Sequence, residues 1–319
     1  MSKSLRLSCG ILVLAAAVIA ATSGTVRAQK VLRWKFTSGQ TFHFVMTQEQ
    51  AQKVKLGTTP MTMTMTMIMT MTQKIESVDP QGVASITQTI DRVQMKMTSP
   101  QGIGMDYDSA SGKPPEGLAK LIAPMFEAMV KKPFTLKVDP QGKVSEMKLP
   151  QGFLESVNKI AGNQMGGLFS EEGMQQMTGQ GMAVLPEKPV SPGDTWSNTL
   201  AMSMPALGKM TAKFTFRYEG TEKRDGKQLE KIATTMEMDI VPDKEKPQPF
   251  QIKITDQKIQ GTSYFDNEAG QLVETKTGGT MKMSMVVGNQ QIEQDIDMNQ
   301  TFRLAPSETP AKSAAPEKP

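Results

Sequence analysis

Strict alternation marks residues 61–72, where methionine holds every odd position and threonine every even one except Ile68. Successive side chains of a β-strand point to opposite faces, so a period of two predicts a strand with one thioether face and one hydroxyl face. A helix would spread the same methionines around its whole axis. This stretch therefore predicts a long β-strand.

The same period recurs on both sides of a central region. Phe42, Phe44 and Met46 share one face of a strand that is expected to begin near Thr41. An Asp-Pro-Gln-Gly turn at residues 79–82 leads into a returning strand, because proline presets φ and glycine accepts a positive φ. Alternation resumes after residue 190 and continues to residue 304. The pattern predicts a mainly β protein, built as a large curved antiparallel sheet or open barrel.

The central region has a different period. Apolar side chains recur every three and four residues over residues 116–132 and again over residues 152–177. This spacing predicts two or three helices that are inserted mid-chain and packed on the sheet. Pro124 lies inside the first stretch and predicts a kink or a restart there.

These patterns predict a single β-rich domain over residues 29–304, with a helical insertion over residues 115–178. Gly-x-Thr-aromatic openings at residues 39–42 and 193–196 match each other. Residues 29–110 and 190–304 are therefore candidate copies, and both a repeated and an unrepeated domain stay open. Residues 305–319, rich in proline, alanine and charge, predict a disordered tail.

The first 28 residues predict a secretory signal peptide. Lys3 and Arg6 precede an apolar run at residues 10–21, and the segment ends in V-R-A at Ala28. A retained anchor is the alternative, although the run is shorter than the roughly 20 residues that a membrane span needs. Cleavage would remove Cys9 and three of the 36 basic residues, leaving 33 against 32 acidic ones. We expect a secreted protein of the periplasm or cell envelope, without a later membrane segment and without nucleic acid as a partner.

Two hairpin sequences carry a resemblance. They are P-F-T-L-K-V-D-P-Q-G-K-V at residues 133–144 and F-D-N-E-A-G-Q-L at residues 265–272. Together with the Gly-x-Thr-aromatic openings, they resemble a family of uncharacterised secreted bacterial β proteins. More loosely, the long strands with interrupting helices are similar to the half-barrels of periplasmic lipoprotein and lipid carriers. The family resemblance implies no catalytic residues.

Catalytic and metal-binding patterns are weak. His43 is the chain's one histidine, Cys9 its one cysteine, and no G-x-S-x-G motif occurs. The Asp295-x-Asp297-x-Asn299 run lacks the glycine and the glutamate that complete a calcium loop. We therefore expect no enzyme activity, no cofactor and no metal site built from these residues.

The methionine faces leave three interpretations open. In the first, they line a cavity for a lipid or another apolar ligand. In the second, they fill the core of a structural or protein-interaction module of the envelope. In the third, they bind Cu(I) through soft thioethers. Against copper, alternate side chains of one strand start about 7 Å apart. A helix over residues 116–132 would cover or plug such a cavity. The protein partner, if any, is not identified. The candidate ligand-lining residues are Met61, Met63, Met65, Met67, Met69, Met71, Met95, Met97, Met236, Met238, Met281, Met283 and Met285.

Overall fold

The computed structural model describes residues 29–56, 59–100, 102, 104–156, 174–175, 178, 185–204, 208–242, 250–287 and 290–305. The signal peptide predicted at residues 1–28, most of the second helical stretch and the tail after residue 305 lie outside the described residues.

In the described part of the chain, twelve strands form one antiparallel sheet. They are β1 (Thr41–Leu56), β2 (Thr59–Val78), β3 (Ala84–Thr98), β4 (Gly104–Asp108), β5 (Pro133–Val138), β6 (Val144–Lys148), β7 (Thr195–Met204), β8 (Gly208–Arg224), β9 (Lys227–Val241), β10 (Phe250–Asp266), β11 (Gln271–Val287) and β12 (Gln290–Leu304).

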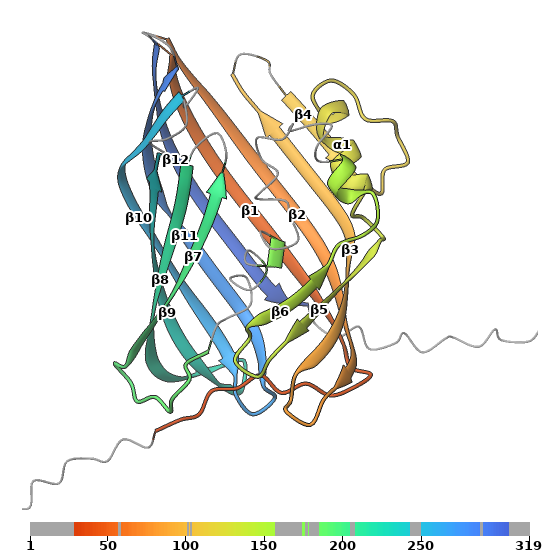
Figure 1. Ribbon diagram of the computed structural model, residues 1–319. Coiled ribbons are helices and arrows are strands. Elements are labelled where there is room, and N and C mark those ends of the chain that lie inside the picture. Colours follow the sequence, from red (N-terminus) through yellow and green to blue (C-terminus); the bar gives the residue numbers. More distant parts are fainter. Residues whose placement is uncertain are drawn as a thin grey trace, which may run out of the picture.

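The strand order is β6-β5-β3-β2-β1-β12-β11-β10-β9-β8-β7, and β4 pairs with the far end of β3. The first and last long strands, β1 and β12, therefore meet in the middle of the sheet. The sheet curves into a half-barrel whose two edges, β6 and β7, do not pair within the described residues (Figure 1). This confirms the predicted large, curved, open antiparallel sheet.

The hydrophobic core lies on the inner face of the sheet. It fills the lower end, as drawn in Figure 1, and continues along β3 to β4 and the helix beside it at the upper end. Ile75 of β2, Leu136 of β5 and Tyr218 of β8 are each at most 2% exposed. Phe44 of β1 stacks on Phe302 of β12 with ring centroids 4.8 Å apart. Because side chains alternate along each strand, every second residue of the long strands points to this same face.

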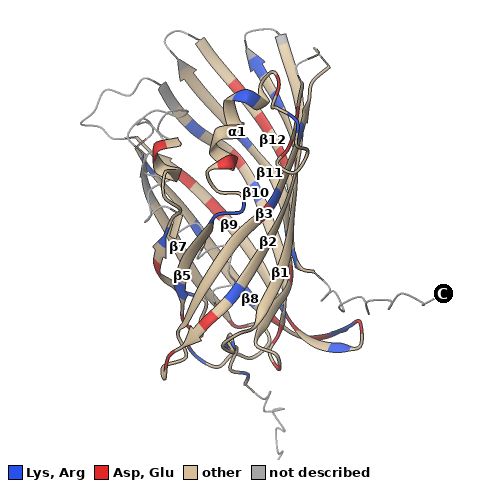
Figure 2. Cartoon of the chain, turned by 90° about the vertical axis from the view of Figure 1, so that its right-hand side faces the viewer, with Lys and Arg blue, Asp and Glu red and all other residues tan. Residues whose placement is uncertain are grey.

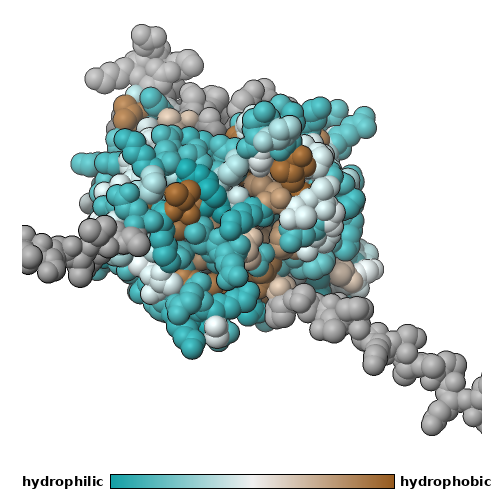
Figure 3. Space-filling model, turned by 90° about the horizontal axis from the view of Figure 1, so that it is seen from below, coloured by the Kyte–Doolittle hydropathy of each residue, from teal (hydrophilic) through white to brown (hydrophobic). Residues whose placement is uncertain are grey.

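An extended segment over residues 29–40 crosses the lower end and closes it (Figure 1). Its amides at Lys30, Trp34 and Lys35 donate to the carbonyls of Val190, Pro140 and Gly270, respectively, at 2.8–2.9 Å. The segment thus connects turns from both halves of the sheet. Seen from below, this end is largely hydrophilic, with only separate hydrophobic spots (Figure 3).

One helix, α1 (Ala119–Glu127), packs beside β4. Phe126 stacks on Tyr107 of β4 at 5.4 Å, and Ala119 and Ala123 are buried. The helix continues through Pro124, so of the two predicted alternatives the restart is wrong, and the kink stays a prediction. Leu121 is 62% exposed, because the buried face is narrower than the apolar stripe in the sequence.

A second short helix begins at Phe153, whose side chain is fully buried against Ala128, and is described as far as residue 156. Both short helices agree with the prediction of helices packed on the sheet. Among the described residues, no helix has the length and apolar character that crossing a membrane requires.

The outer face carries charged and hydroxyl side chains. Lysine, arginine, aspartate and glutamate alternate along the strands rather than gathering by sign (Figure 2). Thr64 and Thr66, on the hydroxyl face of β2, are exposed. The methionine face of β2 is therefore the inner face of the half-barrel.

Candidate functional site

The inner face changes character along β2. Met71 is 8% exposed and belongs to the packed core, and Met69 packs against that core. Met67, Met65 and Met63, higher on the same face, are only half-buried and lie outside the core cluster. The core therefore ends near the middle of the strand, and a partly open apolar surface continues above it.

This surface, which we call the methionine trough, extends over the upper half of the sheet. Its two walls are separated by β1 and β12, a distance of about 14 Å across the sheet. The trough consists of half-buried inner-face methionines, namely Met61, Met63, Met65 and Met67 of β2, Met97 of β3, Met283 and Met285 of β11, and Met298 of β12.

The other predicted lining residues contribute to packing instead. Met281 is 7% exposed, and Met95 packs against the main core. Met238 packs in a small cluster with Leu200 and Ala212. Met236 lines an inner-face cavity of about 80 Å³ beside Phe214 and Ile259. All thirteen predicted methionines therefore share the inner face, but only seven of them lie in the trough.

Glutamines form the floor of the trough, and these residues were not predicted as part of a site. Gln48, Gln50 and Gln52 of β1 stand directly opposite Met67, Met65 and Met63. The amide of Gln52 donates to the Gln294 side chain of β12 at 3.3 Å. The signal was present in the sequence, because the period of two that begins at Phe42 continues through these glutamines.

The side chains of Gln48 and Gln50 make no hydrogen bond to another described residue, and both are half-buried. Each amide offers two donors and a carbonyl acceptor. The trough therefore combines two thioether walls with a hydrogen-bonding floor. Such a surface suits a ligand that is mostly apolar but carries a polar group.

The titratable candidates from the sequence lie away from the trough. His43 is exposed on the outer face, with its Nδ1 3.0 Å from the Thr72 hydroxyl. Asp295 and Asp297 are exposed on β12. Arg92 binds Asp108 through Nε at 2.9 Å, and this contact lowers the pKa of Asp108 to about 2. Within the described residues, no three His, Cys, Asp or Glu side chains gather as a metal site.

A buried carboxylate holds the closed end together. Glu230 of β9 is 4% exposed and accepts a hydrogen bond from the Tyr218 hydroxyl at 2.5 Å. Lys30 of the N-terminal segment forms an ion pair with the same carboxylate. Burial, followed by the contact with Glu230, raises the pKa of Tyr218 to about 12. This network fixes the segment that seals the lower end, and we assign it a structural role.

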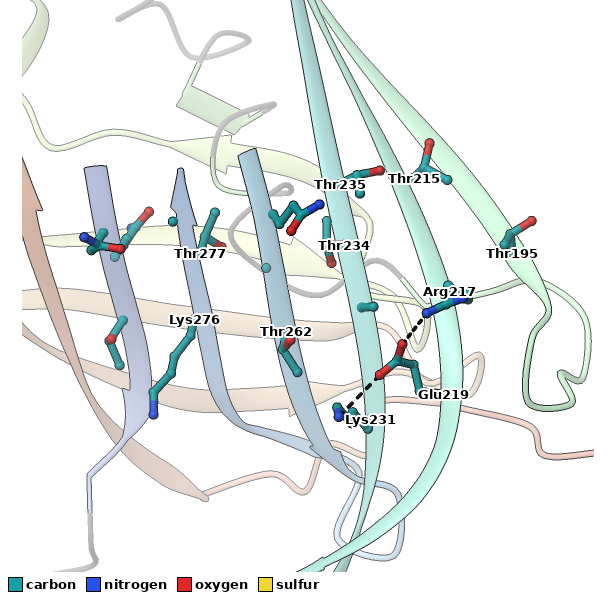
Figure 4. A pocket seen from close by; sticks show the side chains of 17 residues that line it. Thr195, Thr215, Arg217, Glu219, Lys231, Thr234, Thr235, Thr262, Lys276 and Thr277 are labelled. Carbon is teal, nitrogen blue, oxygen red and sulfur yellow. Dashed lines mark hydrogen bonds and ion pairs between the residues drawn. The ribbon is translucent and has the colours of Figure 1, made fainter. Parts of the chain in front are cut away.

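A polar hollow of about 750 Å³ lies on the outer face over β7–β12 (Figure 4). Threonine hydroxyls dominate its wall, and Glu219 pairs with Arg217 at 2.6 Å and with Lys231 at 3.4 Å. The Arg217 contact lowers the pKa of Glu219. A Cβ at Gly278 would lie 2.4 Å from Asn299 Oδ1, so a larger residue there would require the Asn299 side chain to move. The hollow has the size of a ligand site, but its polar wall does not suit an apolar ligand.

Comparison with solved structures finds similar folds at low identity. A lipovitellin structure that describes lipid–protein interactions matches with a TM-score of 0.44 and 12% identity over 88% of this chain. A protein described as exported, with a YmcC-like fold, from Bacteroides fragilis matches with a TM-score of 0.29 and 9% identity, over 86% of this chain and 98% of its own. This chain spans 27% of the lipovitellin chain. These similarities are too weak to transfer a function.

No curated protein matches the sequence. A family model does match, over residues 81–303, which is more than half of the 319-residue chain. The matched region begins in the β2–β3 turn and ends in β12, and thus includes the predicted 133–144 and 265–272 hairpins. The chain therefore belongs to DUF6263, a family of unknown function, in agreement with the resemblance seen in its sequence.

Proposed function

We propose that the chain binds a lipid or another largely apolar ligand in the methionine trough, without catalysing a reaction. One observation carries the proposal. On a single face of β2, Met71 is buried in the core, whereas Met63, Met65 and Met67 are half-buried and lie outside the core cluster. Apolar surface left in water is unfavourable, and continuous patches of it commonly mark binding sites.

The chemistry of the lining supports this choice. Methionine is unbranched and flexible, so a row of methionines adapts to ligands of varied shape. The glutamine floor would bind a carboxyl, ester or hydroxyl group of the ligand. The cavity of about 80 Å³ beside Met236 is too small for a fatty acid, so the ligand would lie in the open trough.

The closed lower end supports a site with one accessible side. Buried Tyr218 and Phe265 fill the half-barrel below the trough, and a ligand would enter from the upper end. A structural module with a filled methionine core would require Met65 to be as buried as Met71. If the chain is exported, as its first 28 residues predict, the ligand would be an envelope lipid or a secreted apolar compound.

The experiment is a titration with a fluorescent fatty-acid probe, combined with native mass spectrometry and solvent extraction of gently purified protein. Met65→Glu places a carboxylate in the trough, and Thr64→Glu is its control on the exposed face of the same strand. We expect Met65→Glu to weaken probe binding at least about tenfold, because a charge must be desolvated, and Thr64→Glu to leave it unchanged. A wild-type protein that binds no probe and retains no lipid would refute the proposal.

A further inference from the structure

Three methionines from three neighbouring strands lie in one row at the level of the trough. The sheet register places Met65 of β2 opposite Met97 of β3, and Met97 opposite Met105 of β4. One level lower, Met67 stands opposite Met95. All five side chains point to the inner face, and Met65, Met97 and Met105 are half-buried.

This register brings methionine side chains closer together than the alternate positions of a single strand do. Directly opposed side chains of an antiparallel pair have Cβ atoms about 4.5–5.5 Å apart, compared with about 7 Å between alternate positions of one strand. The three rotatable bonds of methionine allow the sulfur atoms of Met65 and Met105 to approach that of Met97 from either side. Inward curvature of the sheet also brings inner-face side chains toward one another.

The row is distinctive within the described strands. Met281, Met283 and Met285 of β11 have the same spacing along their strand, but Ile296, Gln294 and Ile292 stand opposite them on β12. Their neighbours on β10 are also not methionines. Of the registers that the structure describes, the Met65–Met97–Met105 row alone joins three methionines.

We infer that this row is a binding site for one soft monovalent cation, Cu(I) or Ag(I), held by the sulfur atoms of Met65, Met97 and Met105. Thioethers are soft ligands that select Cu(I) over harder divalent ions. Met67 and Met95, one level below, offer two further sulfur atoms. Met65 and Met97 belong to the trough, and Met105 packs against the core cluster beside β4. The site goes beyond the proposed ligand binding, which needs only the apolar character of these side chains.

The experiment measures Ag(I) binding to the full chain by calorimetry and native mass spectrometry in chloride-free buffer. Anaerobic competition against a chromogenic chelator measures Cu(I). The test variant is Met65→Leu/Met97→Leu/Met105→Leu, and the matched control is Met281→Leu/Met283→Leu/Met285→Leu. Leucine keeps the apolar volume of methionine and removes the sulfur, so both variants should fold.

We expect one equivalent of metal on the wild type, at least about hundredfold weaker binding by the test variant, and control affinity within about twofold of the wild type. X-ray absorption of the bound metal should show a first shell of sulfur. Fatty-acid probe binding is measured on the wild type alone, so metal binding without probe binding would refute the proposed function and leave this site standing, and probe binding without metal binding would do the reverse. Absence of stoichiometric binding by the wild type, or equal losses in the two variants, would overturn the inference.

Circular dichroism and thermal unfolding check that each variant is folded. If the triple variant does not fold, Met97→Leu alone replaces it, because it removes the central sulfur with a single volume-conserving change. Retention of wild-type metal affinity by folded Met97→Leu would equally exclude the site.

Discussion

Truncation of Met65 tests whether the upper inner face is a trough or part of the core. Met65 and Met71 lie on the same face of β2, but Met71 is 8% exposed within the core and Met65 is half-buried outside it. Replacing a fully buried methionine by alanine removes about three methylene equivalents, worth roughly 2.4 kcal/mol, before any cavity cost is added. We expect Met71→Ala to cost about 3–4 kcal/mol.

Met65→Ala loses roughly two-thirds or more of that transfer free energy and leaves no closed cavity, so it should cost about 1.5–2 kcal/mol. Urea unfolding, monitored by circular dichroism, measures the free energy of unfolding of each variant. Equal m-values make the two free energies comparable. A cost for Met65→Ala of about 3 kcal/mol, equal to that of Met71→Ala, would show that the upper face is packed. The trough would then not exist as described.

Three further predictions concern stability. The folded-state pKa of Asp108 lies at about 2, below its ordinary value, so the ion pair with Arg92 stabilises the fold above pH ~4 and is lost as pH falls toward 2. Asp108→Asn should therefore cost at most about 1 kcal/mol at pH 7 and nothing at pH 2 in thermal unfolding, because solvent screens a partly exposed pair. Glu230→Ala should cost about 2–4 kcal/mol in urea unfolding, since it leaves a buried tyrosine hydroxyl without its acceptor, and a cost below about 0.5 kcal/mol would contradict this role. Gly279→Ala should sharply reduce the yield of folded protein or its melting temperature, because the new Cβ would lie 1.9 Å from the Lys258 carbonyl oxygen; an unchanged melting temperature would contradict this close approach.

The alternation in residues 61–72 was sufficient to predict both the strand and the grouping of its methionines on one face. Local periodicity fixes which side chains share a face, because it depends only on strand geometry. It also identified the helix at α1, where the face that is buried proved narrower than the apolar stripe.

The division between core and trough could not be predicted from the sequence. Met65 and Met71 have the same local pattern, with threonine on either side. Their burial differs because a segment over residues 29–40 and turns from distant strands close only the lower end. Long-range packing of this kind cannot be predicted from the hydrophobic period of a single strand.

The register between neighbouring strands also could not be predicted from the sequence. The Met65–Met97–Met105 row depends on how β2, β3 and β4 pair, and a shift of one residue would remove it. The glutamine floor was predictable in principle, because Gln48, Gln50 and Gln52 follow Phe42 in the same period.

Methionine oxidation by dilute peroxide, resolved to single residues by fragmentation mass spectrometry, with and without a saturating fatty acid, tests the central claim most directly. Exposed thioethers oxidise to sulfoxides faster than buried ones. The account predicts that Met63, Met65 and Met67 oxidise faster than the buried Met71 and Met147, the latter on β6. Of these five, the fatty acid should slow only the three trough methionines. Equal oxidation rates at all five positions, or trough rates that the fatty acid does not change, would contradict it.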